Sequence, residues 1–119
     1  MIWNLNVEGK IMECIDGAVI AYHGYAPEVY TFAAPMTGDP VFATAFDSLV
    51  PNNFRIYNEP DIIPRLPGGF FGYVQVDGGI PIQSHHMPIR SSLLCCHELT
   101  TYLYTLGDTS VNLGSCALR

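Results

Sequence analysis

The clearest hydrophobic pattern in the chain lies between residues 29 and 58. Residues 29–34 (VYTFAA) form a compact apolar run rich in strand-forming side chains, and Pro35 and Gly38 end it. An apolar run of this kind is typical of a strand buried on both faces of a parallel sheet. Residues 54–58 (FRIYN) predict a second short strand.

The segment between these strands has the pattern of an amphipathic helix. Asp39 is suited to cap the helix, and Pro40 suits its first position. Apolar side chains then recur at helical spacing up to about Val50: Phe42, Ala45, Phe46 and Leu49. We therefore expect one strand–helix–strand unit of an α/β fold, with its two strands parallel neighbours and the helix packed on one face.

The flanking segments carry weaker patterns. Residues 11–22 are apolar, and their periodicity allows either a helix or a strand. Residues 59–69 are rich in proline and glycine and predict a loop. The apolar segments 71–76 and 80–83 lie on either side of two adjacent glycines, which is the pattern of a β-hairpin.

The last regular element is predicted at residues 93–106. Gly107 is suited to end a helix there, and we expect the tail, residues 108–119, to be loose. The apolar face of this helix is expected to consist of Leu94, Leu99, Tyr102, Leu103 and Leu106.

Composition and charge narrow the classes of function. Apolar residues make up 49% of the 119 residues and charged residues only 13%, which indicates a folded core. The net charge of −6 and only five scattered Lys and Arg residues argue against binding to nucleic acid or to an anionic membrane surface. The sequence contains no run of 18 apolar residues, so it predicts no membrane span. Residues 1–6 lack the pattern of a secretory leader, so a cytoplasmic location is the default expectation and localisation is left unknown.

The cysteines and histidines do not predict a metal site. The four cysteines include no CxxC pair, and we expect them to be buried or free thiols in a reducing compartment. The adjacent His85 and His86 lie in a polar segment, and neighbouring side chains on extended backbone point apart. They are interpreted as exposed loop residues rather than as ligands of a shared metal.

Two motifs resemble those of a known enzyme family. Residues 29–43 (VYTFAAPMTGDPVFA) are similar to the stretch YTFGxPRxGxxxF of class 3 lipases, with Ala34 where Gly is common and Met36 where Arg is common. Residues 58–67 (NEPDIIPRLP) are similar to that family's NxxDxVPxLP. The resemblance implies the C-terminal half of a class 3 lipase domain, a partial α/β-hydrolase fold, over residues 28–107. It leaves residues 1–27 as a poorly matched N-terminal segment and residues 108–119 as a tail.

Asp61 is the candidate acid of a catalytic triad. The resemblance to NxxDxVPxLP gives it that role. Its position just past a predicted strand agrees, because open α/β sheets place their active sites at the carboxyl ends of the strands. The structural alternative is a turn aspartate whose side chain caps the backbone of Ile62 and Ile63.

His97 is the candidate general base. Residues 97–103 (HELTTYL) resemble the closing element of the family, in which a His is followed by a Tyr and an aliphatic residue. The alternative is a half-buried histidine bonded to backbone at the start of a helix. Residues 72–76 (GYVQV) look like the family's GYxHxG strand, with Gln75 in place of a histidine outside the triad. The resemblance implies a lipid or ester substrate and no cofactor.

The nucleophile is missing from this pattern. A serine hydrolase of this fold needs a GxSxG turn between a strand and a helix, and none of the six serines lies in such a motif. If residues 7–14 (VEGKIMEC) stood for the turn, Ile11 would occupy the serine position. Cys14 is the nearest thiol and the only candidate substitute, although it lacks the flanking glycines.

Three functional interpretations follow. The first is a lipase-type ester hydrolase of triacylglycerol metabolism whose serine is lost or supplied elsewhere, so that this chain alone is inactive. The second is a non-catalytic pseudo-hydrolase or interaction module, and the third is an unrelated small α/β binding domain. A half-sheet exposes an edge and an apolar face, so we expect marginal stability, with self-association or pairing with a missing N-terminal half. A gene fragment, a split product and a decayed paralogue all remain open.

Overall fold

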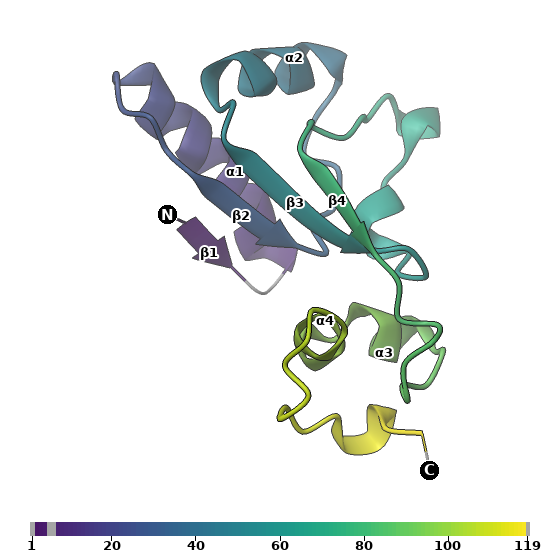
Figure 1. Cartoon of the computed structure of the whole chain (residues 1–119). Coiled ribbons are helices and arrows are strands. Elements are labelled where there is room, and N and C mark those ends of the chain that lie inside the picture. The colour runs from purple at the N-terminus through teal and green to yellow at the C-terminus, as the bar shows by residue number, and fades with distance from the viewer. Residues whose placement is uncertain (1, 5–6, 119) are drawn as a thin grey trace.

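The core of the molecule is a parallel four-stranded sheet. A computed structural model describes residues 2–4 and 7–118, with side chains from residue 15 onward. The strands are β1 (Ile2–Asn4), β2 (Val29–Phe32), β3 (Asn53–Asn58) and β4 (Gly79–Ile82), in the spatial order β1-β2-β3-β4 (Figure 1). Every neighbouring pair is parallel. All four carboxyl ends therefore lie at one edge of the sheet, where α/β folds place their sites.

The predicted strand–helix–strand unit is confirmed. Val29 pairs with Asn53 and Phe32 with Ile56 in parallel register. Helix α2 (Pro40–Leu49) joins the two strands, and the Asp39 side chain accepts a hydrogen bond of 2.9 Å from the Phe42 amide at its N-terminus. The ambiguous segment at residues 11–22 belongs to a helix, α1 (Val7–Tyr22).

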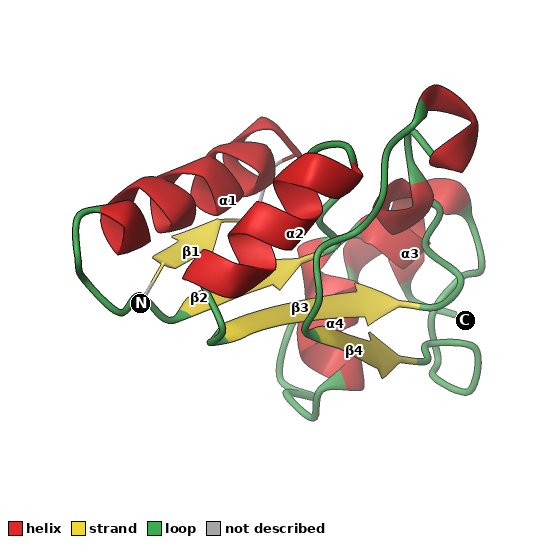
Figure 2. Ribbon diagram, turned by 90° about the horizontal axis from the view of Figure 1, so that it is seen from above, coloured by secondary structure: helices red, strands yellow, loops and turns green. Residues whose placement is uncertain are grey.

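The helices cover the two faces of the sheet differently. Figure 2 shows α1 and α2 side by side on one face, where Val29 of the sheet packs against Phe46 of α2. The other face carries Phe32 and Ile56, which pack against Tyr102 of α4 (Leu99–Thr105). Because side chains alternate along a strand, the buried strands supply apolar groups to both layers.

The predicted hairpin was wrong. Segment 71–76 does not pair with segment 80–83, and β4 pairs with β3 in parallel. Val74 instead bridges Gly38 beside α2, and Val76 is buried in the cluster on that face. The Gly78 carbonyl accepts a hydrogen bond of 2.8 Å from the Arg55 amide, so the glycine begins the pairing of β4 with β3 instead of turning the chain back.

The predicted last helix is two short helices. Helix α3 (Leu93–His97) ends at Glu98, whose backbone is extended at φ −63° and ψ 139°, and α4 begins directly after it. The expected apolar face is only partly buried, since Leu94 is 66% exposed and Tyr102 is fully buried. The break turns α4 beneath the sheet and leaves His97 at the end of α3.

Candidate active site at the carboxyl edge of the sheet

Asp61 lies in the loop that follows β3 and is almost completely buried, at 1% exposure. Its amide donates a hydrogen bond of 2.9 Å to the Asn58 carbonyl, which closes a turn at the end of the strand. Its Oδ1 accepts a 3.0 Å bond from the Ile63 amide. The turn-capping role is therefore real, but it occupies only one carboxylate oxygen and leaves Oδ2 for other partners.

His97 is one of two partners of that second oxygen. Its Nδ1 lies 2.9 Å from Asp61 Oδ2, although the two residues are 36 positions apart in the sequence. An ionised carboxylate only accepts hydrogen bonds, so this contact holds the proton on Nδ1 and leaves Nε2 as the basic nitrogen. The imidazole is partly accessible, with 23% of the side chain exposed, whereas the Asp61 side chain is fully buried. This arrangement can orient a base that faces outward.

Tyr102 joins Asp61 and His97 as a third member of this cluster. The motif indicated only that a tyrosine follows the histidine. Its hydroxyl donates a 2.7 Å hydrogen bond to Asp61 Oδ2 and accepts a 2.9 Å bond from the Asn58 amide. Burial raises the pKa of the Tyr102 phenol far above its usual range, and the Asp61 carboxylate adds to that rise. The phenol therefore stays protonated and serves as a donor to Asp61. The pattern of apolar positions had assigned Tyr102 only to the helix face.

Cys96 is a buried free thiol next to this cluster. Burial raises its pKa, the charge of Asp61 raises it further, and a hydrogen bond with Ser84 lowers it only in part. A thiol in such surroundings stays protonated and is a poor nucleophile. The side chain of Cys14, the candidate substitute, lies outside the described residues.

The positions proposed for a nucleophile turn do not form one. The backbone of Ile11 lies inside α1, four residues after its start at Val7, and not at a junction between a strand and a helix. Residues 7–14 therefore do not stand for the turn. His85 and His86 are exposed in a turn, and within residues 2–4 and 7–118 no group of three His, Cys, Asp or Glu is placed to hold a metal ion.

The loops after β2 and β3 are tied together by Gln75. Its amide Nε2 donates to the Ala34 carbonyl at 3.0 Å and to the Pro64 carbonyl at 2.9 Å. Gln75 stands where the similar motif often has a histidine, and it joins the loop of Asp61 to the loop after β2. In that second loop the left-handed backbone, at φ 56°, belongs to Ala33 and not to Ala34. The conformation that favours glycine therefore lies at Ala33, which is the position that the glycine of YTFGxP takes when the motif is counted from Tyr30, so Ala34 was the wrong position for it.

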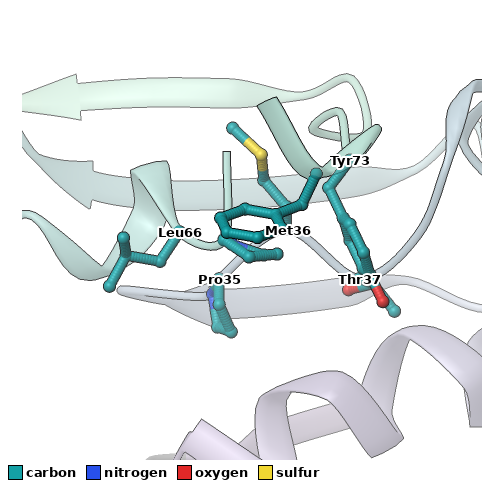
Figure 3. A pocket seen from close by; sticks show the side chains of 7 residues that line it. Pro35, Met36, Thr37, Leu66 and Tyr73 are labelled. Carbon is teal, nitrogen blue, oxygen red and sulfur yellow. The ribbon is translucent and has the colours of Figure 1, made fainter. Parts of the chain in front are cut away.

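An open apolar pocket of about 620 Å³ lies between the same two loops. Figure 3 shows the side chains that line it, which come from the segment after β2 and from residues 66–73. Phe70, beside it, is 96% exposed. The pocket is lined by Pro35, Met36, Thr37, Leu66, Pro67, Phe71 and Tyr73. Such a surface suits an aliphatic or aromatic ligand rather than a charged one.

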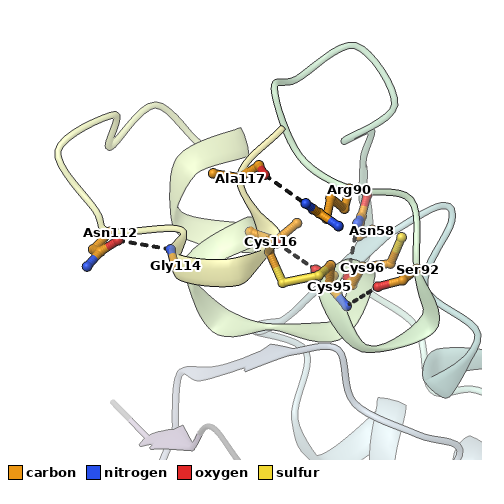
Figure 4. Close-up of a disulfide and its surroundings, with 10 residues drawn as sticks. Asn58, Arg90, Ser92, Cys95, Cys96, Asn112, Gly114, Cys116 and Ala117 are labelled. Carbon is orange, nitrogen blue, oxygen red and sulfur yellow. Dashed lines mark hydrogen bonds between the residues drawn. A yellow bond between two sulfur atoms is a disulfide. The ribbon is translucent and has the colours of Figure 1, made fainter. Parts of the chain in front are cut away.

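A disulfide braces the helix that carries His97. Cys95 bonds to Cys116 across 21 residues, so the expectation of free thiols was wrong for these two cysteines (Figure 4). The tail is not loose at this point, because Cys116 is buried and Ala117 forms a β-bridge with Ile89. Disulfides persist in oxidising compartments, which removes the basis for expecting a reducing one.

Comparisons with known proteins relate part of this chain to a family. Residues 15–71 match the family model described as "Lipase (class 3)". A lipase of Caenorhabditis elegans, ZK262.3, is 44% identical over 41 residues, which is 34% of this chain and 12% of the relative. Phospholipase A1-II 1 of rice (Oryza sativa subsp. indica) is 26% identical over 93% of this chain and 30% of its own length. The chain thus spans less than a third of these relatives.

Solved structures show the same fold. A mutant form of MDLA from Penicillium cyclopium has a TM-score of 0.57 and 25% identity, covering 66% of this chain and 28% of that one. Lip2 lipase from Yarrowia lipolytica has a TM-score of 0.59 and 21% identity, covering 92% of this chain and 46% of that one. Both similarities support a partial α/β-hydrolase fold for this chain.

Proposed function

Because this chain carries part of a class 3 lipase-like domain of the α/β-hydrolase fold, we propose that it supplies the acid and the base of an ester-hydrolysing site. The observation that carries the proposal is the 2.9 Å contact between His97 Nδ1 and Asp61 Oδ2. Asp61 is the acid that orients the imidazole, and His97 is the general base. The lipase-like portion comprises residues 28–107, with residues 1–27 before it and a tail at 108–119.

The roles follow from the chemistry of acyl transfer. Nε2 of His97 accepts the proton of a serine hydroxyl as the serine oxygen attacks the ester carbonyl, and returns it to the leaving alcohol. The buried Asp61 carboxylate stabilises the imidazolium that forms. In the part of the chain that the structure describes, no hydrogen-bond partner occupies Nε2, so this nitrogen is free for that task.

The substrate class is inferred from the apolar pocket. The pocket between the loops after β2 and β3 has walls of proline, methionine, leucine and aromatic side chains, which suit an acyl chain. The relatives are named lipase and phospholipase A1, and both names describe enzymes that cleave lipid esters. We therefore propose a lipid ester, in triacylglycerol metabolism, as the substrate of the complete site.

The nucleophile has to come from outside these 119 residues, because they contain no GxSxG motif. The chain alone is therefore inactive, and the site is completed by pairing with the N-terminal half of a lipase-type domain. No described helix is long and apolar enough to span a membrane. Exposed side chains such as Phe70 favour self-association of the unpaired chain.

The second candidate function is non-catalytic. The absence of a GxSxG serine favours a pseudo-hydrolase or interaction module that keeps the scaffold without the chemistry. Restoring the nucleophile discriminates between the two functions, because a decayed site does not regain turnover when it is supplied with a serine.

The experiment measures hydrolysis of p-nitrophenyl esters in two steps. The purified chain alone is expected to show no turnover above background, and His97→Ala is expected to change nothing. The chain is then co-expressed with the N-terminal half of a class 3 lipase that carries its GHSLG serine. Turnover that is abolished by His97→Ala, and kept in the control His86→Ala on the exposed turn, supports the proposal.

Two outcomes contradict it. A complex that assembles by sedimentation but remains inactive favours the non-catalytic function. Turnover by the chain alone that His97→Ala abolishes overturns the assignment of an inactive chain, and Cys14 is then the first residue to test.

A further inference from the structure

We propose that Asn58 is the positioning residue that sets the contact between Asp61 and His97, an inference that rests on the proposed function. Asn58 is the last residue of β3 and is completely buried, at 0% exposure. Its side chain and backbone bond to four residues in four different segments of the chain. These partners are Asp61, Ser84, Cys96 and Tyr102.

The backbone of Asn58 controls the acid. Its carbonyl accepts the Asp61 amide at 2.9 Å, and its own amide donates to the Tyr102 hydroxyl at 2.9 Å. The same hydroxyl donates to Asp61 Oδ2 at 2.7 Å. Asn58 is thus linked to Asp61 in two ways, directly to its backbone amide and through the Tyr102 hydroxyl to its carboxylate. Both links start at the end of a rigid central strand.

The side chain of Asn58 controls the base. Nδ2 donates a 3.1 Å bond to the carbonyl of Cys96, the residue directly before His97, as Figure 4 shows. No amide of α3 donates to that carbonyl, because the helix breaks at Glu98 and the last carbonyls of a helix lack intrahelical donors. Asn58 therefore anchors the backbone of His97 to β3.

A second pair of bonds holds the Asn58 amide itself in one orientation. Nδ2 donates to Ser84 Oγ at 2.8 Å, and Oδ1 accepts the Ser84 amide at 3.0 Å. With both ends of the amide engaged, the donor aimed at Cys96 cannot rotate away without breaking a buried bond. One side chain therefore couples the position of the base to the position of the acid.

The test is a spectroscopic signature of the Asp61–His97 bond in the full chain. A hydrogen-bonded imidazole Nδ1–H gives a proton NMR signal far downfield, which is assigned by its disappearance in His97→Ala. Asn58→Ala is expected to lower the ratio of bonded to open imidazole about fivefold, because one lost hydrogen bond of about 1 kcal/mol changes an equilibrium constant by that factor, and so to weaken this signal. Asn53→Ala removes a second buried amide from the other end of the same strand, and it is expected to keep the signal.

The outcomes separate positioning from general stability. An undiminished signal in folded Asn58→Ala overturns the proposal, and so does an equal loss in Asn53→Ala. If Asn58→Ala does not fold, Ser84→Ala takes its place with the same expectation and the same contradicting result. It removes the hydroxyl that orients the amide and that also bonds the Cys96 thiol. The readout needs no hydrolysis. An inactive reconstituted enzyme would therefore count against the proposed function alone, and an unchanged signal would count against Asn58 alone.

Discussion

Strand β3 has a buried asparagine at each end, and the hydrogen bonding of the two side chains differs. At the carboxyl end, Asn58 uses both its Nδ2 and its Oδ1 in hydrogen bonds. At the amino end, Asn53 donates through Nδ2 to the Asp77 carbonyl at 2.8 Å, and its Oδ1 is the only buried side-chain oxygen or nitrogen in the described part of the chain without a partner. The carboxyl end is organised by directional polar contacts, which is what a site requires.

The amino end is organised by close backbone approach instead. Gly78 has φ +84°, and a Cβ on it would lie 2.0 Å from the Asn53 carbonyl oxygen. Only glycine allows β4 to begin so close to β3. The difference teaches that steric fit positions one end of the strand and hydrogen bonding positions the other, so different substitutions should damage each end.

The largest effect is expected for Gly78→Ala. The new methyl group meets backbone that cannot yield, and the left-handed conformation is strained for alanine. We expect a loss of about 3–4 kcal/mol in the free energy of unfolding, measured by urea titration. Gly72→Ala is the control, since Gly72 has φ +78° but open space around its Cβ position, and it should cost only about 1 kcal/mol. Equal costs would show that backbone strain, and not close approach, requires glycine at position 78.

Asn58→Ala should cost more than Asn53→Ala. Removing the Asn58 amide leaves the Cys96 carbonyl and the Ser84 amide without their partners, and each orphaned buried group costs about 1–3 kcal/mol. Removing the Asn53 amide orphans only the Asp77 carbonyl. We expect losses of about 3 and about 1 kcal/mol, compared by thermal melting. A larger loss at Asn53 would reverse the contrast between the two ends.

Tyr102→Phe should have a smaller effect that depends on pH. Because burial raises the pKa of the phenol in the folded chain, the unfolded chain loses this proton first as the pH rises above about 10. The stability of the natural chain should therefore fall above pH 10, by about 1.4 kcal/mol per pH unit for this one group. Tyr102→Phe should lose this part of the slope, and at neutral pH it should cost about 1–2 kcal/mol through the lost bonds to Asp61 and Asn58. Identical slopes for the two chains between pH 9.5 and 11, roughly the range in which tyrosine titrates, would contradict the buried donor.

Asp47, at the amino end, should show the smallest effect. Its Oδ1 accepts the Asp77 amide at 2.8 Å, and burial raises the pKa of its carboxyl, helped by the charge of Asp77. A raised pKa in the folded state means that the stabilising contribution is present at low pH and is lost as the pH rises above the ordinary aspartate value. Asp47→Asn keeps an acceptor for the Asp77 amide and should remove this pH dependence. Melting curves measured from acidic to neutral pH that show the same trend in both chains would exclude Asp47 as its source.

The sequence by itself determined the elements whose signals are local. The apolar run of β2, the Asp39 and Pro40 start of α2 and the following β3 appear in the structure as their patterns predict, because capping and periodicity act within a few residues. The resemblance to class 3 lipase motifs also implied the pairing of Asp61 with His97, and in the structure His97 Nδ1 lies 2.9 Å from Asp61 Oδ2.

Tertiary structure alone decided the features that depend on distant partners. The glycines at 78 and 79 resemble a hairpin turn. The Arg55 amide of β3, however, donates a hydrogen bond to the Gly78 carbonyl, and β4 pairs with β3 in parallel. The pattern of residues 93–106 predicts one helix. In the structure, however, Asn58 donates to the Cys96 carbonyl and the Thr101 hydroxyl donates to the Cys95 carbonyl. The helix therefore divides at Glu98. The Cys95–Cys116 bond likewise depends on where the tail returns. Local propensities leave such choices nearly balanced, and hydrogen bonds across the fold then decide them.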